Sequence, residues 1–119
     1  MNAALRGLPV LPFDTHPSVN AGSSSTAEFT WLNADLIPEA PASLRYRLDN
    51  LTDYRNLVAW TAVVTPLAET SIPITPSQNA MTQTWRDRQW MQLTAEATMD
   101  DGTVKSELWM YELIAGVLP

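Results

Sequence analysis

The feature that most constrains the fold is a series of short runs in which apolar and polar residues alternate, starting near Glu28. The clearest run is residues 43–48, where Leu44, Tyr46 and Leu48 alternate with two arginines. Because neighbouring side chains of a strand point to opposite faces, this pattern predicts a half-buried β-strand. A chain built from such runs, with no helix between them, is expected to be all-β and antiparallel, as a sandwich or a small barrel.

Other segments have the composition of strands as well. Residues 29–32 are expected to form the first strand. Residues 57–64 are almost entirely apolar on both faces, so they are interpreted as a central strand with Trp60 in the core. Prolines surround Ile72 and Ile74, which predicts a short edge strand, because proline cannot donate to a central ladder.

Residues 88–99 and 104–113 are expected to pair as the last hairpin of the fold. The intervening Asp101-Gly102 is a strong hairpin signal, since a type I′ turn requires positive φ at both central residues. Residues 77–85 have no clear periodicity and fit either one helical turn or a loop that crosses between sheets.

The first quarter of the chain, residues 1–27, is expected to be an extended arm, and residues 28–119 a single β-sandwich domain. Prolines and glycines interrupt any helix or strand in the arm. The arm nevertheless carries apolar residues, whose exposure is unfavourable by about 0.8 kcal/mol per CH₂ group. They are therefore predicted to pack on a partner; the alternative is that the arm wraps the chain's own domain or is disordered. The candidates for partner contact are Leu5, Leu8, Val10, Leu11 and Phe13. Fully extended, the arm would reach at most about 90 Å.

Charge and composition exclude several functional classes. The chain of 119 residues has 7 Lys plus Arg against 13 Asp plus Glu, a net charge of −6, which opposes binding to nucleic acid or anionic lipid. There is no cysteine, and therefore no disulfide framework or thiolate chemistry. The amino terminus lacks the continuous apolar run of a secretory signal, so the chain is expected to start in the cytoplasm, with no membrane partner.

Catalytic groups are scarce in the sequence. The single histidine, His16, stands in the arm, where a triad with Asp14 and a nearby serine would lack a rigid scaffold. Asp100 and Asp101 form a carboxylate pair, but a turn exposed to water keeps both ionised, and a complete calcium loop is missing. We therefore expect no enzyme, no cofactor and no bound metal.

One cluster, Trp85-Arg86-Asp87-Arg88-Gln89-Trp90, is rich in the residue types found at interface hot spots. The candidate surface contacts are Trp85, Arg86, Arg88 and Trp90. Trp90 is the better placed tryptophan, because it is out of phase with the apolar face of its strand. The alternative interpretation is that one tryptophan fills the core while the arginines pair with Asp87 or Glu96.

The order of the segments 44–48, 58–61, 72–75 and 93–97, with Asp101-Gly102 and then Tyr111, resembles an immunoglobulin- or fibronectin-type sandwich. Over residues 28–117 it is more narrowly similar to small accessory structural proteins of tailed bacteriophage virions. The resemblance implies a non-enzymatic module in multiple copies, bound to other virion proteins in the capsid, neck or tail, and assembled in the host cytoplasm. The chain departs from true immunoglobulin domains in lacking both cysteines of the inter-sheet bridge, although Trp60 stands where a core tryptophan is expected.

An alternative function is a carbohydrate- or ligand-binding module, for example in host-surface adhesion. Aromatic side chains on a β-sandwich can stack on sugar rings, and Trp85, Trp90 and Trp109 are the candidates for such a platform. An enzyme ranks last, because no positioned acid, base, nucleophile or metal set can be named from the sequence.

Overall fold

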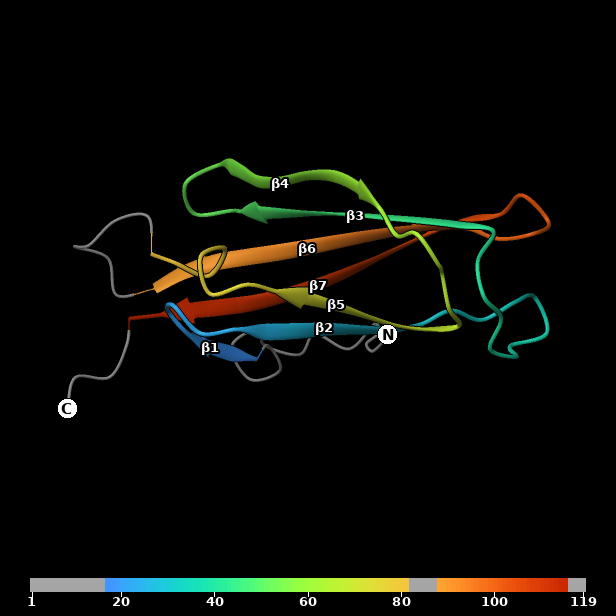
Figure 1. Ribbon diagram of the computed structural model, residues 1–119, viewed down its shortest axis with the longest axis horizontal. Helices are drawn as coiled ribbons and strands as arrows, with labels where there is room; N and C mark the ends of the chain where they lie inside the picture. The colour runs from blue at the N-terminus through green and yellow to red at the C-terminus, as the bar shows by residue number, and fades with distance from the viewer. Residues whose placement is uncertain (1–16, 82–87, 116–119) are drawn as a thin grey trace, which may run out of the picture.

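The computed structural model describes residues 17–81 and 88–115, and it folds them into two β-sheets (Figure 1). The strands are β1 (Ser18–Asn20), β2 (Ser25–Thr30), β3 (Ser43–Asn50), β4 (Arg55–Ala62), β5 (Glu69–Ile74), β6 (Arg88–Thr98) and β7 (Val104–Ile114). One sheet has the order β1-β7-β6-β3-β4, and the other contains β2 and β5. All pairs are antiparallel except β1 with β7. The predicted all-β, mainly antiparallel fold is confirmed; the described residues contain no helix, and so none that could cross a membrane.

A single apolar core forms from residues of both sheets. The predicted alternation of the sixth strand is confirmed, because Met91, Leu93, Ala95 and Ala97 are all fully buried. From β2 and the residue after it, Phe29 and Trp31 stack in the same core with ring centres 5.8 Å apart. Full burial of each such large side chain stabilises the fold by about 1.5–3 kcal/mol, so this face holds the two sheets together.

The strand expected at the centre of a sheet is an edge strand instead. Among the described strands, β4 is the last of the five-stranded sheet and pairs only with β3. Trp60, expected in the core, is 38% exposed on the face away from β2 and β5. The prediction was wrong because two arginine side chains of β3 cover this indole, so an apolar residue here did not need the core. By contrast, the short edge strand predicted around Ile72 and Ile74 is confirmed as β5.

The hairpin between β6 and β7 is confirmed, but its turn differs from the type I′ prediction. Gly102 N–H donates to Met99 O at 2.9 Å, and Met99 N–H donates to Thr103 O at 2.8 Å, which closes a three-residue loop. Only Gly102 in this loop has positive φ, at 87°. The geometry is that of a type I turn followed by one left-handed residue, which requires a single glycine.

Part of the predicted arm belongs to the folded unit. β1 lies within residues 1–27, and the predicted boundary between residues 27 and 28 falls inside β2. Val19 of β1 packs against the core, and Gly22, with φ at 81°, allows the turn from β1 into β2. Residues 1–16, with the five candidate arm contacts, lie outside the described residues.

Residues 75–80, which follow β5, form tight turns. Asn79 in these turns is fully buried and bonds to two other segments of the chain. Its Nδ2 donates to Ser23 O at 2.8 Å and to Ser25 Oγ at 3.0 Å, and its Oδ1 accepts from the Tyr111 hydroxyl at 2.6 Å. The rest of the predicted loop, residues 82–85, lies outside the described residues.

Candidate interaction surface

The outer face of the five-stranded sheet, which points away from β2 and β5, carries a cluster of arginine and tryptophan side chains. Alternation along β3 buries Leu44 and Leu48 and therefore places Arg45 and Arg47 on this outer face. Both guanidinium groups lie over the Trp60 ring of β4. The Cζ atom of Arg45 is 4.2 Å from the ring centre, and that of Arg47 is 5.7 Å from it. Guanidinium groups stack favourably on indole faces, so the three side chains hold one another in place.

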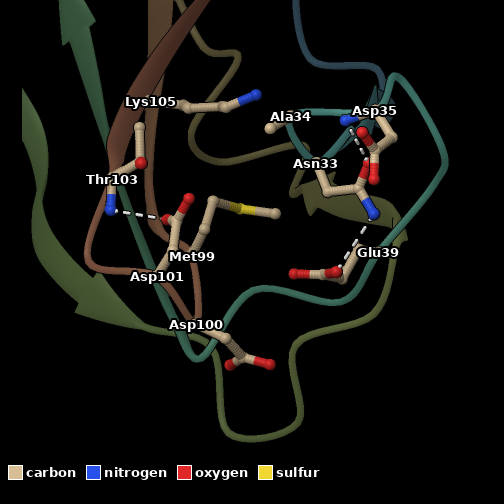
Figure 2. Close-up of a pocket in the computed structure, with 9 residues that line it drawn as sticks. All are labelled: Asn33, Ala34, Asp35, Glu39, Met99, Asp100, Asp101, Thr103 and Lys105. Carbon is tan, nitrogen blue, oxygen red and sulfur yellow. Dashed lines mark hydrogen bonds between the residues drawn. The ribbon is translucent and has the colours of Figure 1, made fainter.

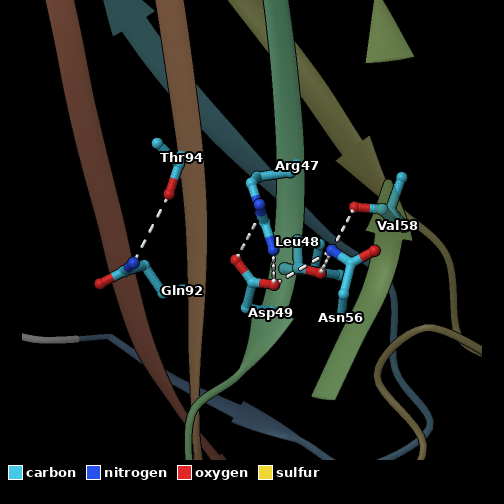
Figure 3. Close-up of polar contacts among 7 residues, drawn as sticks. All are labelled: Arg47, Leu48, Asp49, Asn56, Val58, Gln92 and Thr94. Atoms are coloured by element: carbon cyan, nitrogen blue, oxygen red, sulfur yellow. Dashed lines mark hydrogen bonds and ion pairs between the residues drawn. The ribbon is translucent and has the colours of Figure 1, made fainter. Parts of the chain in front are cut away.

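Carboxylates on the same face neutralise these arginines. Arg45 forms an ion pair with Glu96 of β6 at 2.7 Å, and Arg47 forms one with Asp49 at 2.8 Å. Figure 3 shows that Asn56 Nδ2 also donates to Asp49, at 3.0 Å. Burial raises the pKa of Asp49, but the hydrogen bonds from Arg47 and Asn56 outweigh it and hold the pKa below its ordinary value.

This arrangement is suited to contact rather than to proton transfer. Its charges are paired, and its aromatic ring is covered by guanidinium groups that still reach solvent. Arginine and tryptophan offer large contact areas with directed donors, which is why both are enriched at protein interfaces. We name the outer-face cluster by its residues: Arg45, Arg47, Asp49, Asn56, Trp60 and Glu96.

Two of the four surface residues predicted from the sequence lie on the same outer face. Arg88, at the start of β6, is exposed and pairs with Glu112 at 3.1 Å, a different partner from the Asp87 or Glu96 considered above. Trp90 is half-buried, and its backbone N–H donates to Thr52 Oγ1 at 2.8 Å. Trp85 and Arg86 lie outside the described residues.

Trp90 also lines a mostly apolar hollow of about 380 Å³ on the outer face. The other side chains around it come from the β3–β4 connection and from β7: Leu51, Thr52 and Met110. The alternative interpretation of residues 85–90, in which one tryptophan fills the core, therefore does not hold for Trp90. Trp31 is the tryptophan buried in the core.

The predicted aromatic platform for sugars is not formed by its two described members. Trp109 of β7 pairs in register with the buried Leu93 and contacts Tyr111, with ring centres 5.0 Å apart, so it lies on the core face. Trp90 lies on the opposite face of the same sheet. Two rings on opposite faces cannot stack on one ligand.

A hollow of about 370 Å³ lies where the β2–β3 connection meets the β6–β7 hairpin, and several carboxylates surround it (Figure 2). Two of these carboxylates, those of Glu39 and Asp101, form hydrogen bonds within local turns. Asn33 Oδ1 accepts from the backbone N–H of Asp35 at 2.8 Å, and its Nδ2 donates to Glu39 at 3.2 Å. Asp101 accepts from the Thr103 N–H at 2.9 Å.

Hydrogen bonds from Thr103 hold the pKa of Asp101 below its ordinary value, so this carboxylate stays ionised. Lys105 on the other side of the hollow donates to the backbone oxygen of Leu32. Within residues 17–81 and 88–115, no three His, Asp or Glu side chains are arranged to hold a metal ion. The hollow is explained by turn formation, as the sequence predicted for Asp100 and Asp101.

Sequence reasoning missed the outer-face cluster around Trp60. The two arginines at alternate positions of one strand were a visible signal, but their partner depended on which strand lay beside β3.

Comparison with known proteins supplies no independent guide, because no protein-family model, curated protein or solved structure matches this chain.

Proposed function

We propose that this chain is a non-enzymatic structural module with an immunoglobulin-like sandwich, which docks by its N-terminal arm onto other proteins of a tailed-bacteriophage particle. Capsid decoration and the head–tail junction are the positions that fit a small module present in several copies. The observation that carries the proposal is the attachment of the arm. The apolar segment that contains Leu5, Leu8 and Phe13 leads directly into β1, at the edge of the larger sheet.

Fixing one end of the arm favours docking by the other. β1 is tied to β7 by backbone bonds, among them Ala21 N–H to Ile114 O at 2.8 Å and Glu112 N–H to Pro17 O at 3.0 Å. Ordering a free segment costs about 1–2 kcal/mol per residue, so an arm that is held at its base has fewer residues left to order on binding. The acidic net charge and the paired charges of the outer-face cluster fit a protein partner better than a nucleic acid.

The test is incorporation into purified particles of the phage that encodes the chain. Deletion of residues 1–16 leaves Pro17 and β1 in place, and the double variant Leu5→Ser/Leu8→Ser keeps the full length. Both are expected to fold and to lose at least about nine-tenths of their incorporation, since a few apolar anchors dominate an interface. As a matched control, Asn2→Ser should incorporate normally. Unchanged incorporation of both arm variants would refute docking by the arm.

A further inference from the structure

Among the described strands, β7 is unpaired along most of one edge. On one side it pairs with β6 along all eleven residues, from Val104 to Ile114. On the other side, β1 covers only Glu112–Ile114, as Figure 1 shows near the end of the β7 arrow. Within residues 17–81 and 88–115, no strand pairs with residues 104–111 on that side. We call this stretch of β7 the open edge, because it presents backbone groups that can accept another strand.

Two other edge strands carry features that discourage such pairing. The pairing of β4 with β3 shifts register twice, which makes β4 irregular. β5 contains Pro73, which has no N–H to offer. The open edge contains no proline, and its pairing with β6 is regular throughout. Its geometry therefore suits the addition of a further strand.

The backbone groups that face the open edge belong to the even-numbered residues of β7. On the side of β1, Glu112 donates its N–H at 3.0 Å and Ile114 accepts with its oxygen at 2.8 Å. Because successive residues of a strand direct their backbone groups to opposite sides, the same side of the open edge presents those of Val104, Ser106 and Leu108. A strand that joins the edge must bond to these three residues.

The side chains at the start of the open edge form their own complement when read in the opposite direction. Residues 104–108 are Val-Lys-Ser-Glu-Leu. In an antiparallel pair of two copies centred on Ser106, Lys105 of each copy would face Glu107 of the other. The residues at the two ends, valine and leucine, would also face each other. Opposite charges and apolar side chains are both favourable partners across strands.

We infer that two copies of this chain pair through residues 104–108 of β7, antiparallel and centred on Ser106. The exposure of the single chain agrees with this arrangement. Val104 and Leu108 are 58% and 59% exposed, and the pairing would cover each with the other. Lys105 donates to the Leu32 oxygen, but an ammonium has three N–H groups and can also bond to a carboxylate.

The charges of the open edge also oppose the neighbouring registers. Hydrogen bonding requires even residues to face even residues, so the alternative centres are Lys105, Glu107 and Leu108. A centre at Lys105 or at Glu107 would place like charges directly opposite each other, which is destabilising. A centre at Leu108 would bring the start of one β7 to the part of the other that β1 already covers. Opposite charges and an uncovered edge coincide when the centre is Ser106.

The resulting assembly is a closed dimer. In a two-fold pair each copy uses its open edge once, so the contact does not propagate into a filament. The larger sheets of the two copies would continue into one sheet through the β7–β7 contact. This inference stands on residues of β7 and does not depend on whether the chain belongs to a virion.

Sedimentation velocity of the full chain over a wide range of concentrations gives the first test. The inference predicts a reversible monomer–dimer equilibrium. Lys105→Glu and Glu107→Lys each create two pairs of like charges across the contact, so each variant is expected to associate at least about tenfold more weakly. A full chain that stays monomeric at every concentration, or a dimer that both variants leave unchanged, would overturn the inference.

Charge exchange supplies the matched control. In Lys105→Glu/Glu107→Lys the two charges trade places, so the double variant is expected to dimerise like the original chain. An equimolar mixture of the two single variants should form a heterodimer, because one copy then carries two acidic and the other two basic side chains. Failure of both the double variant and the mixture to associate would contradict the pairing of Lys105 with Glu107.

A cysteine pair tests the register without a change of charge. The chain has no cysteine, and Ser106→Cys would place two thiols opposite each other at the centre of the contact. Mild oxidation should yield a covalent dimer, measured by intact mass. In Val104→Cys the two thiols would lie about 13 Å apart along the strands and should not form a bridge. Bridging in both variants, or in neither, would refute the register.

Discussion

The buried Asn79 side chain joins three parts of the chain that are distant in sequence. It bonds to Ser23 and Ser25 near the start of the folded unit and to Tyr111 near its end. Burial raises the pKa of the Tyr111 phenol, so its hydroxyl remains a donor to Asn79 Oδ1 at all physiological pH values. A buried amide with several partners is costly to remove, since each group left unpaired loses its hydration without compensation.

Asn79→Ala is therefore expected to reduce the free energy of unfolding by about 3 kcal/mol, measured by urea denaturation. Tyr111→Phe removes only one bond of this group and should cost about 1–2 kcal/mol, because it leaves Asn79 with its two serine partners. Equal costs for the two variants, or a cost near zero for Asn79→Ala, would show that the junction does not stabilise the fold.

Asp49 gives the outer-face cluster a dependence on pH. Its pKa is lower in the folded chain than in the unfolded one, so the unfolded state binds the proton more readily. The stabilisation by its bonds to Arg47 and Asn56 is present above the unfolded pKa near 4 and is lost as the pH falls through the folded pKa.

Asp49→Asn should consequently flatten the loss of stability below about pH 4, measured as the thermal midpoint between pH 2 and 7. Asn56→Ala removes one of the donors and is expected to produce part of the same flattening. An acid profile that is unchanged in Asp49→Asn would contradict the assigned role of these bonds.

At the scale of single elements, the β6–β7 hairpin depends on one glycine. Gly102 has φ at 87°, and an added Cβ would meet nothing within 4 Å. The cost of Gly102→Ala is therefore one of backbone conformation and is expected to be about 1 kcal/mol, measured by thermal or urea unfolding. Gly102→Asn should cost less, because asparagine tolerates left-handed conformation better than alanine. A larger cost for asparagine would indicate a different turn in solution.

Strands with regular alternation could be predicted from the sequence, and those without it could not. β3 and β6 were found because one face of each is buried and the other polar. β1 was missed because a strand of three residues is too short to show a period, and because it pairs with Glu112–Ile114, near the other end of the chain. The edge position of β4 was hidden because its apolar residues are partly covered by arginine side chains of β3.

The candidate surface was predictable only in part, for a similar reason. The arginine and tryptophan content of residues 85–90 marked a possible contact site, and Trp90 and Arg88 do lie on the outer face. The cluster around Trp60 needs three strands in register, with Arg45 opposite Glu96 and beside Ala62. Pairing of this kind is set by the whole sheet, and no local pattern specifies it.

For the whole molecule, we propose that the first residues of the arm are bound only when the chain is on a particle. Arg6 offers a direct readout, because it is the only Lys or Arg before Arg45 of β3. Brief trypsin treatment followed by intact-mass measurement compares the free chain with particles that contain it. The proposal predicts rapid loss of residues 1–6 from the free chain and protection of Arg6 on the particle. Equal rates of cleavage in both states would contradict it.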